Sequence, residues 1–315
     1  MPTPSGQIGL SDVNAELGNS PSAQINMNSA PVRGLAEVPS GAISMSNLQN
    51  KSNVKFIVAS GGSETTSGDF KIHTFNSSGT FTVSDAGNPA GSDTVDYLVI
   101  AGGAGGGREP DSRAGGGGAG GYRIDYPNPA TGGLPVSVGA IPVTVGGGGG
   151  SNNPGSSSNF STISSSGGGS QGRPGGSGGG QHTFQSGGTG NAGGYSPPEG
   201  NPGGTFSNQA GAGGGGAGSS GRGGQSFNAG GGGDGASTDI DGSSTTRAGG
   251  GGGAGGGSNG PGGPGGGGEG GRQTGGRRSG EPGDANTGSG GGGSPSSRSG
   301  GSGGSGKVII RYKFQ

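Results

Sequence analysis

Residues 249–257 read Gly-Gly-Gly-Gly-Gly-Ala-Gly-Gly-Gly, and runs of this kind decide the fold. Eight similar runs occur, some interrupted by one Ala, Ser or Pro: 102–107, 115–121, 146–150, 175–180, 211–218, 230–233, 262–268 and 290–293. The chain has 315 residues and 94 glycines. Only 11 of these glycines lie in residues 1–100 and none in 307–315, so 83 fall within 101–306. So high a glycine content excludes a conventional side-chain core for this segment.

Collagen, a flexible linker and a polyglycine lattice are the three structures that such a composition can form. Collagen needs Gly at every third residue, and that frame holds from Gly262 to Gly271 and then meets Thr274. A Gly/Ser linker would leave 101–306 unordered. We favour extended polyglycine II helices, which have about three residues per turn and no internal hydrogen bonds. Their N–H and C=O groups then bond to neighbouring helices, which the missing Cβ atoms allow to pack closely.

Hydrogen bonds must stabilise this body, because residues 101–306 contain only 13 Val, Ile, Leu and Phe side chains. Ordering each residue costs about 1–2 kcal/mol, and a hydrogen bond returns about 0.5–1.5 kcal/mol net. The lattice must therefore be nearly complete, with Gly wherever a helix is surrounded and other residues at edges and loops. We predict an irregular and β fold class: a small N-terminal module with short helices, a β collar, and a polyglycine II bundle or sandwich whose C-terminal strand returns to the collar.

The predicted collar covers residues 53–100. Segments 70–75 and 80–84 alternate around the turn Asn76-Ser77-Ser78-Gly79 and predict a hairpin. Residues 94–101 form an apolar strand that runs directly into the body at 101–306. Residues 307–315 are again strand-like, so we expect them to leave the body and pair with 94–101. Strand-like 134–145 and 160–163 should lie at the same base.

Residues 1–52 form a separate module with a weak internal repeat. The pattern Ile-x-Leu/Met-Ser/Asn begins at Ile8, Ile25 and Ile43 and predicts three short extended-then-helical units. So small a module should bury its Ile, Leu and Met poorly, and we expect it to dock on another protein. A merely ordered arm is the alternative, and self-association through the module is left open.

Several functions are excluded by composition. Without Cys there are no disulfides or thiolate metal sites, and the two histidines, His73 and His182, are too few for a His-based zinc site. Asp239 and Asp241 have a spacing found in calcium loops, but the required Glu is missing, so a solvated turn is favoured. The sequence predicts no catalytic residue, no cofactor and no metal.

Nucleic-acid binding and membrane insertion are also not expected. The chain carries 17 basic and 18 acidic residues, and only one Arg-Gly-Gly occurs, at Arg222. Apolar stretches are far shorter than the roughly 20 residues that span a bilayer. No secretory signal is apparent at Met1–Gly6, so we expect synthesis and maturation in the cytosol, or exit from the cell by a route other than secretion.

The chain resembles glycine-rich tail-fibre and adhesin proteins of tailed bacteriophages. The resemblance lies in the glycine runs, in Leu98–Gly103 and Gly306–Tyr312, and in the N-terminal segments 8–18 and 40–48. The similarity is greatest to the type found in phages of marine and cyanobacterial hosts. It implies a polyglycine II sandwich whose tip loops contact the receptor. It also implies a virion tail protein that assembles in the host cytoplasm.

The resemblance implies these partners: other virion or tail proteins bound through residues 1–52, and a host-surface glycan or outer-membrane protein. Two alternatives remain open. One is a purely structural virion or fibre component without receptor contact. The other is a secreted glycine-rich protein that binds ice or a cell wall.

Receptor-binding residues are predicted from chain direction. Runs that leave the collar must return to it, so the connecting loops alternate between the collar and the far end. Counting from Ala101 makes 108–113 the first far-end loop, followed by 181–185 and by 272–286. Aromatic faces and arginine forks suit recognition of sugars or protein loops. The predicted receptor-binding residues are Arg108, Arg113, His182, Phe184 and Arg277.

Overall fold

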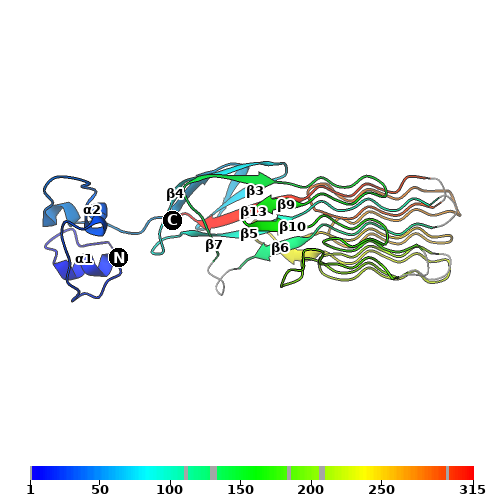
Figure 1. The fold of residues 1–315 in the computed structure, drawn as a ribbon, viewed down its shortest axis with the longest axis horizontal. Coiled ribbons are helices and arrows are strands. Elements are labelled where there is room, and N and C mark those ends of the chain that lie inside the picture. Colours follow the sequence, from blue (N-terminus) through cyan, green and yellow to red (C-terminus); the bar gives the residue numbers. More distant parts are fainter. Residues whose placement is uncertain (1, 110–112, 128–132, 183–185, 206–209, 296–297) are drawn as a thin grey trace.

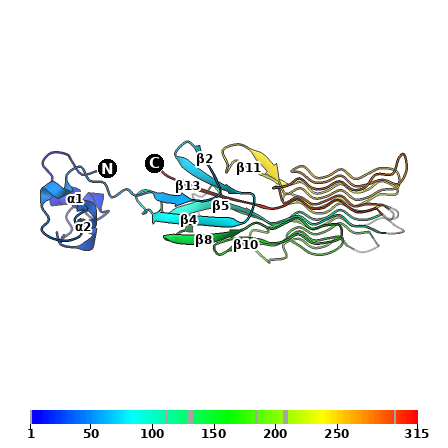
Figure 2. The ribbon, with the colours of Figure 1, turned by 90° about the horizontal axis from the view of Figure 1, so that it is seen from above.

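The computed structural model describes residues 2–109, 113–127, 133–182, 186–205, 210–295 and 298–315. It shows an elongated protein with a helical module, a β collar and a long glycine-rich body, in that order along the molecule (Figure 1). Viewed from above, the glycine runs lie side by side and extend away from the collar (Figure 2). The architecture therefore agrees with the predicted fold class.

The N-terminal module consists of α1 (Leu10–Glu16), α2 (Ala30–Ala36) and the 3₁₀ helix η1 (Met45–Leu48). These are the three units that the repeat predicts. The expectation that the module buries its Ile, Leu and Met poorly is wrong for Leu35 and Leu48, which are 4% and 0% exposed, whereas Leu10 is 46% exposed. Val13, Val32, Leu35, Ala36 and Leu48 form a buried core, and the Ile and Met residues of the repeat pack around it. Three short helices bring their apolar faces to one centre, so even this small module has its own core.

Two sheets build the collar. The five-stranded sheet has the order β1-β4-β8-β9-β10; the six-stranded sheet has the order β2-β3-β13-β5-β6, with β7 paired to β5. β11 and β12 form a separate two-stranded sheet. The bounds are β1 Ile57–Ser60, β2 Ser63–Ser67, β3 Phe70–Phe75, β4 Gly79–Ala86, β5 Thr94–Ile100, β6 Tyr122–Asp125, β7 Leu134–Pro135, β8 Gly139–Thr144, β9 Ser158–Phe160, β10 Ile163–Ser165, β11 Ala236–Thr238, β12 Thr245–Arg247 and β13 Lys307–Lys313.

The central strands of the six-stranded sheet, β3, β13 and β5, are buried on both faces, whereas β2 at its edge is exposed. Val308 and Ile310 of β13 point into the core between the two sheets, whereas Ile309 packs in a second core on the opposite face. Ile240, in the turn between β11 and β12, closes that second core. Burial on both faces explains why residues 97–100 of β5 and 308–310 of β13 are continuously apolar instead of alternating. As predicted, β13 pairs antiparallel with β5.

The predicted hairpin around residues 76–79 is wrong. β3 pairs with β2 and β13, whereas β4 pairs with β1 and β8, so the two strands lie in different sheets. The physical reason is competition from β13, which supplies fully buried Val308, Ile309 and Ile310 to the edge of β3. The local turn therefore becomes a connection between the two sheets.

The glycine runs are polyglycine II helices, because their hydrogen-bond partners recur every three residues. Successive N–H groups of the run 114–121 donate in turn to three different runs, with N···O distances between 2.8 and 3.0 Å. Its carbonyls accept hydrogen bonds from three more runs. The six neighbours are 211–215, 288–291, 166–169, 101–107, 177–180 and 251–254. A helix with three residues per turn and no internal hydrogen bonds directs its groups to all sides in this way.

Four further runs are surrounded as completely: 101–107, 211–216, 249–254 and 288–294. All five contain only Gly, Ala and Ser. Prolines of the body occupy runs with fewer neighbours: Pro154, Pro174, Pro202, Pro261, Pro264 and Pro282. Proline has no N–H to donate, so it is tolerated where one side of a run faces solvent.

The expectation that surrounded runs need Gly throughout is wrong at a few positions, because Ala104, Ala114 and Ala119 are buried there. Ala119 packs in the second collar core, so its methyl group faces side chains and not a neighbouring carbonyl. Ala114 uses space that Gly107 leaves open, since a Cβ added at Gly107 would lie 2.9 Å from the Ala114 methyl carbon. Alanine is thus tolerated where the space between neighbouring runs is large enough for one methyl group.

A pH-dependent stability is expected from Asp96 on β5. Burial raises the pKa of Asp96 from 3.8 to about 6, and nearby Arg311 opposes that shift. The folded state therefore holds this proton more tightly than the unfolded chain, so its contribution to stability is present below pH 3.8 and lost as the pH rises to about 6. Asp96→Asn should abolish the part of the pH dependence of stability that Asp96 causes.

The measurement is the melting temperature of wild type and Asp96→Asn across this pH range. Burial lowers the pKa of His73, which contributes stability in the opposite direction as the pH rises. The difference between the two curves is therefore the informative quantity. Parallel curves would contradict the assignment.

Candidate functional site at the far end of the body

Loops of the body gather at the end remote from the collar (Figure 1). The N–H of Gly107 donates to the Gly115 carbonyl, so an outward run ends at Gly107 and a returning run begins beside it, as predicted; residues 110–112 of the predicted loop lie outside the described residues. Arg272 and Arg278 exchange backbone hydrogen bonds and close another turn. The expectation for 272–286 is correct only in its first part. Gly288 accepts from Gly120, close to β6, so the residues around 286 lie at the collar end.

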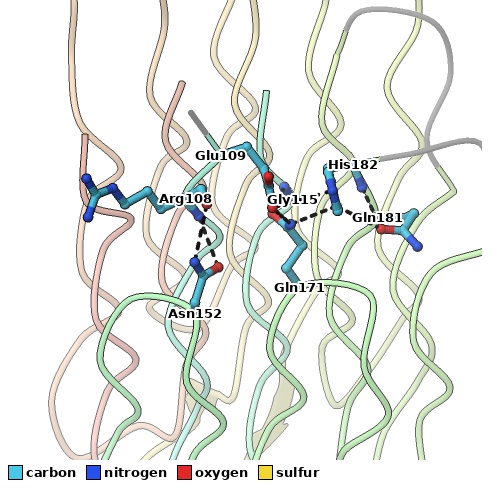
Figure 3. A network of polar contacts seen from close by, with 7 residues as sticks. All are labelled: Arg108, Glu109, Gly115, Asn152, Gln171, Gln181 and His182. Atoms are coloured by element: carbon cyan, nitrogen blue, oxygen red, sulfur yellow. Dashed lines mark hydrogen bonds and ion pairs between the residues drawn. The ribbon is translucent and has the colours of Figure 1, made fainter. Parts of the chain in front are cut away.

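Backbone contacts fix Arg108 while its side chain stays exposed. Its N–H donates to Oδ1 of Asn152 at 3.0 Å, and Nδ2 of Asn152 donates back to the Arg108 carbonyl at 3.3 Å. Asn152 lies in a shorter turn, and its amide takes the place of a neighbouring glycine run. Figure 3 shows the Arg108 guanidinium pointing away from the other residues drawn. Arg108 is therefore positioned to meet an external group.

His182 belongs to a polar network with Glu109, Gln171 and Gln181 (Figure 3). Oε1 of Gln171 accepts from the Gly115 N–H at 2.9 Å, which orients the amide. Its Nε2 then donates to Oε1 of Glu109 at 2.7 Å and lies 2.7 Å from Nδ1 of His182. Nδ1 of His182 also lies 3.1 Å from Oε1 of Gln181, and its Nε2 lies 3.4 Å from Oε1 of Glu109. The network joins two far-end loops.

Arg113 lies among residues of two other loops. Its Nη2 donates to Oε1 of Gln273 at 3.4 Å, and its guanidinium carbon lies 5.7 Å from the centre of the Phe227 ring. Phe227 is 53% exposed, so much of its ring remains open to solvent. We call Arg113, Phe227 and Gln273 the Arg113 cluster. Its members are distant in sequence and meet because Ala254 donates to the Ala114 carbonyl, which brings the 255–259 turn beside Arg113.

The remaining predicted residues do not join these groups. Arg277 is exposed within the 272–278 turn, and no contact of its side chain is found among the residues that the structure describes. Phe184 lies outside the described residues. The predicted set is thus divided between the His182 network, the Arg113 cluster and separate exposed arginines.

Sequence reasoning missed Glu109, Gln171, Gln273 and Phe227. Phe227 could have been found, because it lies between the runs 211–218 and 230–233 in the same way as Phe184 lies between two other runs. Gln171 and Gln273 carried no such signal, since their roles depend on which runs become neighbours.

Charge is segregated along the body. Six arginines lie on far-end turns: Arg108, Arg113, Arg272, Arg277, Arg278 and Arg298. Arg278 pairs with Glu281 at 2.7 Å; within the described ranges, the other five have no carboxylate partner. Most carboxylates lie toward the collar, including Asp241, which pairs with buried Arg247. The far end is therefore basic, although the whole chain has a formal net charge of −1.

Among the described residues, no group of three or more His, Asp or Glu is able to hold a metal ion. In the same residues, no helix has both the length and the apolar character needed to cross a membrane. What the far end offers chemically is hydrogen-bond donors, positive charge and an exposed aromatic ring.

Fold and site define a class of protein in which a polyglycine lattice displays polar loops at one end. The sequence signature of the glycine-rich domain family matches residues 76–313, and the chain belongs to that family. This match includes most of the collar and the whole body but leaves out the N-terminal module. No curated protein matches the chain.

Proposed function

We propose that the chain is a bacteriophage tail-fibre adhesin that binds a host-surface receptor through the loops at the far end of its glycine body. The observation that carries the proposal is the separation of the two ends: the far-end loops lie at one, and the N-terminal module lies at the other (Figure 1). The far-end loops carry exposed arginines and Phe227, which is 53% exposed. An adhesin needs both an attachment end and a recognition end, held apart.

Residues 1–52 are the attachment end in this proposal. The module has its own core, so it can act as a separate unit that binds another virion protein. Leu10 remains 46% exposed and is an apolar side chain available to such a partner. The lattice between the two ends keeps them at a fixed separation, because each surrounded run is hydrogen bonded on all sides.

Adsorption of the purified, fluorescently labelled chain to bacterial cells tests the proposal. We expect wild type to label the cells of hosts from a panel that includes cyanobacteria. A triple variant, Arg108→Ala, Arg113→Ala and Arg277→Ala, should reduce cell-bound fluorescence at least about tenfold, because charged anchors dominate such interfaces. Lys55→Ala, an exposed cation of the collar, is the matched control.

Thermal unfolding of the triple variant should match wild type, since these side chains lie outside the lattice. Undiminished adsorption by the folded triple variant would refute recognition at the far end. A chain lacking 1–52 should still adsorb to cells but should no longer be incorporated into particles. Normal incorporation would refute the role of the module.

A further inference from the structure

We infer that the far end binds an acidic saccharide, whose sugar ring stacks on Phe227 and whose carboxylate or phosphate group pairs with the arginines beside it. This inference rests on the proposed function and names the chemistry of the receptor. It depends on the Arg113 cluster, on the pocket next to it and on the charge at this end of the body.

The charge at the far end calls for an anionic partner. Arg108, Arg272, Arg277 and Arg298 share with Arg113 the lack of a carboxylate partner within the described part of the chain. The Nε atoms of Arg113 and Arg272 are buried without a hydrogen-bond partner there. A buried donor without an acceptor is costly, and an anionic oxygen is the acceptor that a guanidinium binds most strongly. Five such cations on adjoining turns raise the local concentration of anions.

Phe227 supplies the reason to choose a sugar. The guanidinium of Arg113 lies 5.7 Å from the centre of the ring, and the ring is 53% exposed. An open aromatic face is a flat apolar surface, which matches the C–H face of a pyranose ring. A simple inorganic anion has no apolar face that could pack against this ring.

The turn that carries Phe227 also forms one wall of a pocket of about 260 Å³. Its lining includes Arg222, Gln225, Asn228 and Pro261. Gln225 and Asn228 exchange backbone hydrogen bonds at 2.8 Å, so the turn is held in place without using the Gln225 side-chain amide. Amide groups pair with sugar hydroxyls as both donors and acceptors, and Arg222 adds another cation. An aromatic ring, side-chain amides and guanidinium groups are together the groups needed to bind an acidic saccharide.

Binding of the full chain to immobilised polysaccharides tests the inference. The probes are polygalacturonate, which carries carboxylates, phosphomannan, which carries phosphates, and neutral dextran, with biolayer interferometry as the measurement. We expect binding to at least one acidic polymer and none to dextran, and the two acidic arms tell which anion is recognised. Affinity should fall as salt rises from about 0.05 to 0.3 M, because exposed charges are screened.

Two variants separate a built site from general charge attraction. Arg113→Lys keeps the charge but loses the planar fork, and Phe227→Leu keeps an apolar residue but loses the ring. Each should weaken binding at least about tenfold, whereas Lys55→Gln should not change it. The inference is overturned if dextran binds equally, if neither acidic polymer binds, or if both variants bind like wild type. Cell adsorption by wild type together with any of these results would leave the adhesin proposal standing.

Discussion

Replacing Gly252 with valine is expected to destabilise the glycine body by about 3 kcal/mol or more. A Cβ at Gly252 would lie 2.0 Å from the carbonyl oxygen of Gly260, where no real contact is that short. Neither side can move freely, because the run 249–254 is hydrogen bonded to six neighbours. The lattice must either open or lose several hydrogen bonds. Thermal unfolding followed by circular dichroism or calorimetry measures the effect.

Gly147 provides the matched control. A Cβ at this position meets no atom within 4 Å, although Gly147 belongs to the uninterrupted glycine run 146–150. Gly147→Val should leave stability unchanged or raise it by up to about 1 kcal/mol, since the unfolded chain loses freedom. The adjacent Gly148→Ala should destabilise, because its Cβ would lie 1.9 Å from the Gly303 carbonyl oxygen. Equal stability of all three variants would refute the lattice.

Removal of residues 307–315 is expected to prevent the collar from folding. β13 lies between β3 and β5 and pairs with both, so its loss creates two new edges within the six-stranded sheet. It also removes Val308, Ile309 and Ile310, which are fully buried, from two cores at once. Tyr312 is lost as well, and with it a 3.1 Å hydrogen bond to buried His73. We expect rapid limited proteolysis and no cooperative unfolding transition.

A full-length variant tests the same point without shortening the chain. Ile310→Asp places an unpaired carboxylate between the two sheets and should cost more than about 4 kcal/mol. Deletion of exposed Gln315 alone should have no effect. If the chain lacking 307–315 unfolds cooperatively at the temperature of wild type, β13 is not needed to close the collar.

Most of the architecture could be predicted because it depends on local properties. Three extended-then-helical units follow from the repeat at Ile8, Ile25 and Ile43, and all three are present. The pairing of 307–313 with 94–100 follows from two apolar segments that need partners at the same base. The hairpin around 76–79 failed because a remote strand competes for β3, and nothing in residues 70–84 reveals that competitor.

Only part of the far-end site could be predicted. Counting runs identified Arg108, Arg113 and His182 as distal, because a run that leaves the collar must return. The same count did not pair His182 with Glu109 or Arg113 with Phe227. Those contacts depend on which runs lie next to each other, and glycine runs carry no side chains that could specify a neighbour.

The sequence by itself determined that the glycine runs within residues 101–306 form a hydrogen-bonded lattice. The absence of Cβ atoms is a property of each residue, and so few apolar side chains leave no other source of stability. Only the tertiary structure decided which runs are surrounded, where single alanines fit and which arginines gather at the far end. Runs of nearly identical composition are interchangeable in sequence, so their lengths, their turns and the strands that anchor them in the collar select each neighbour.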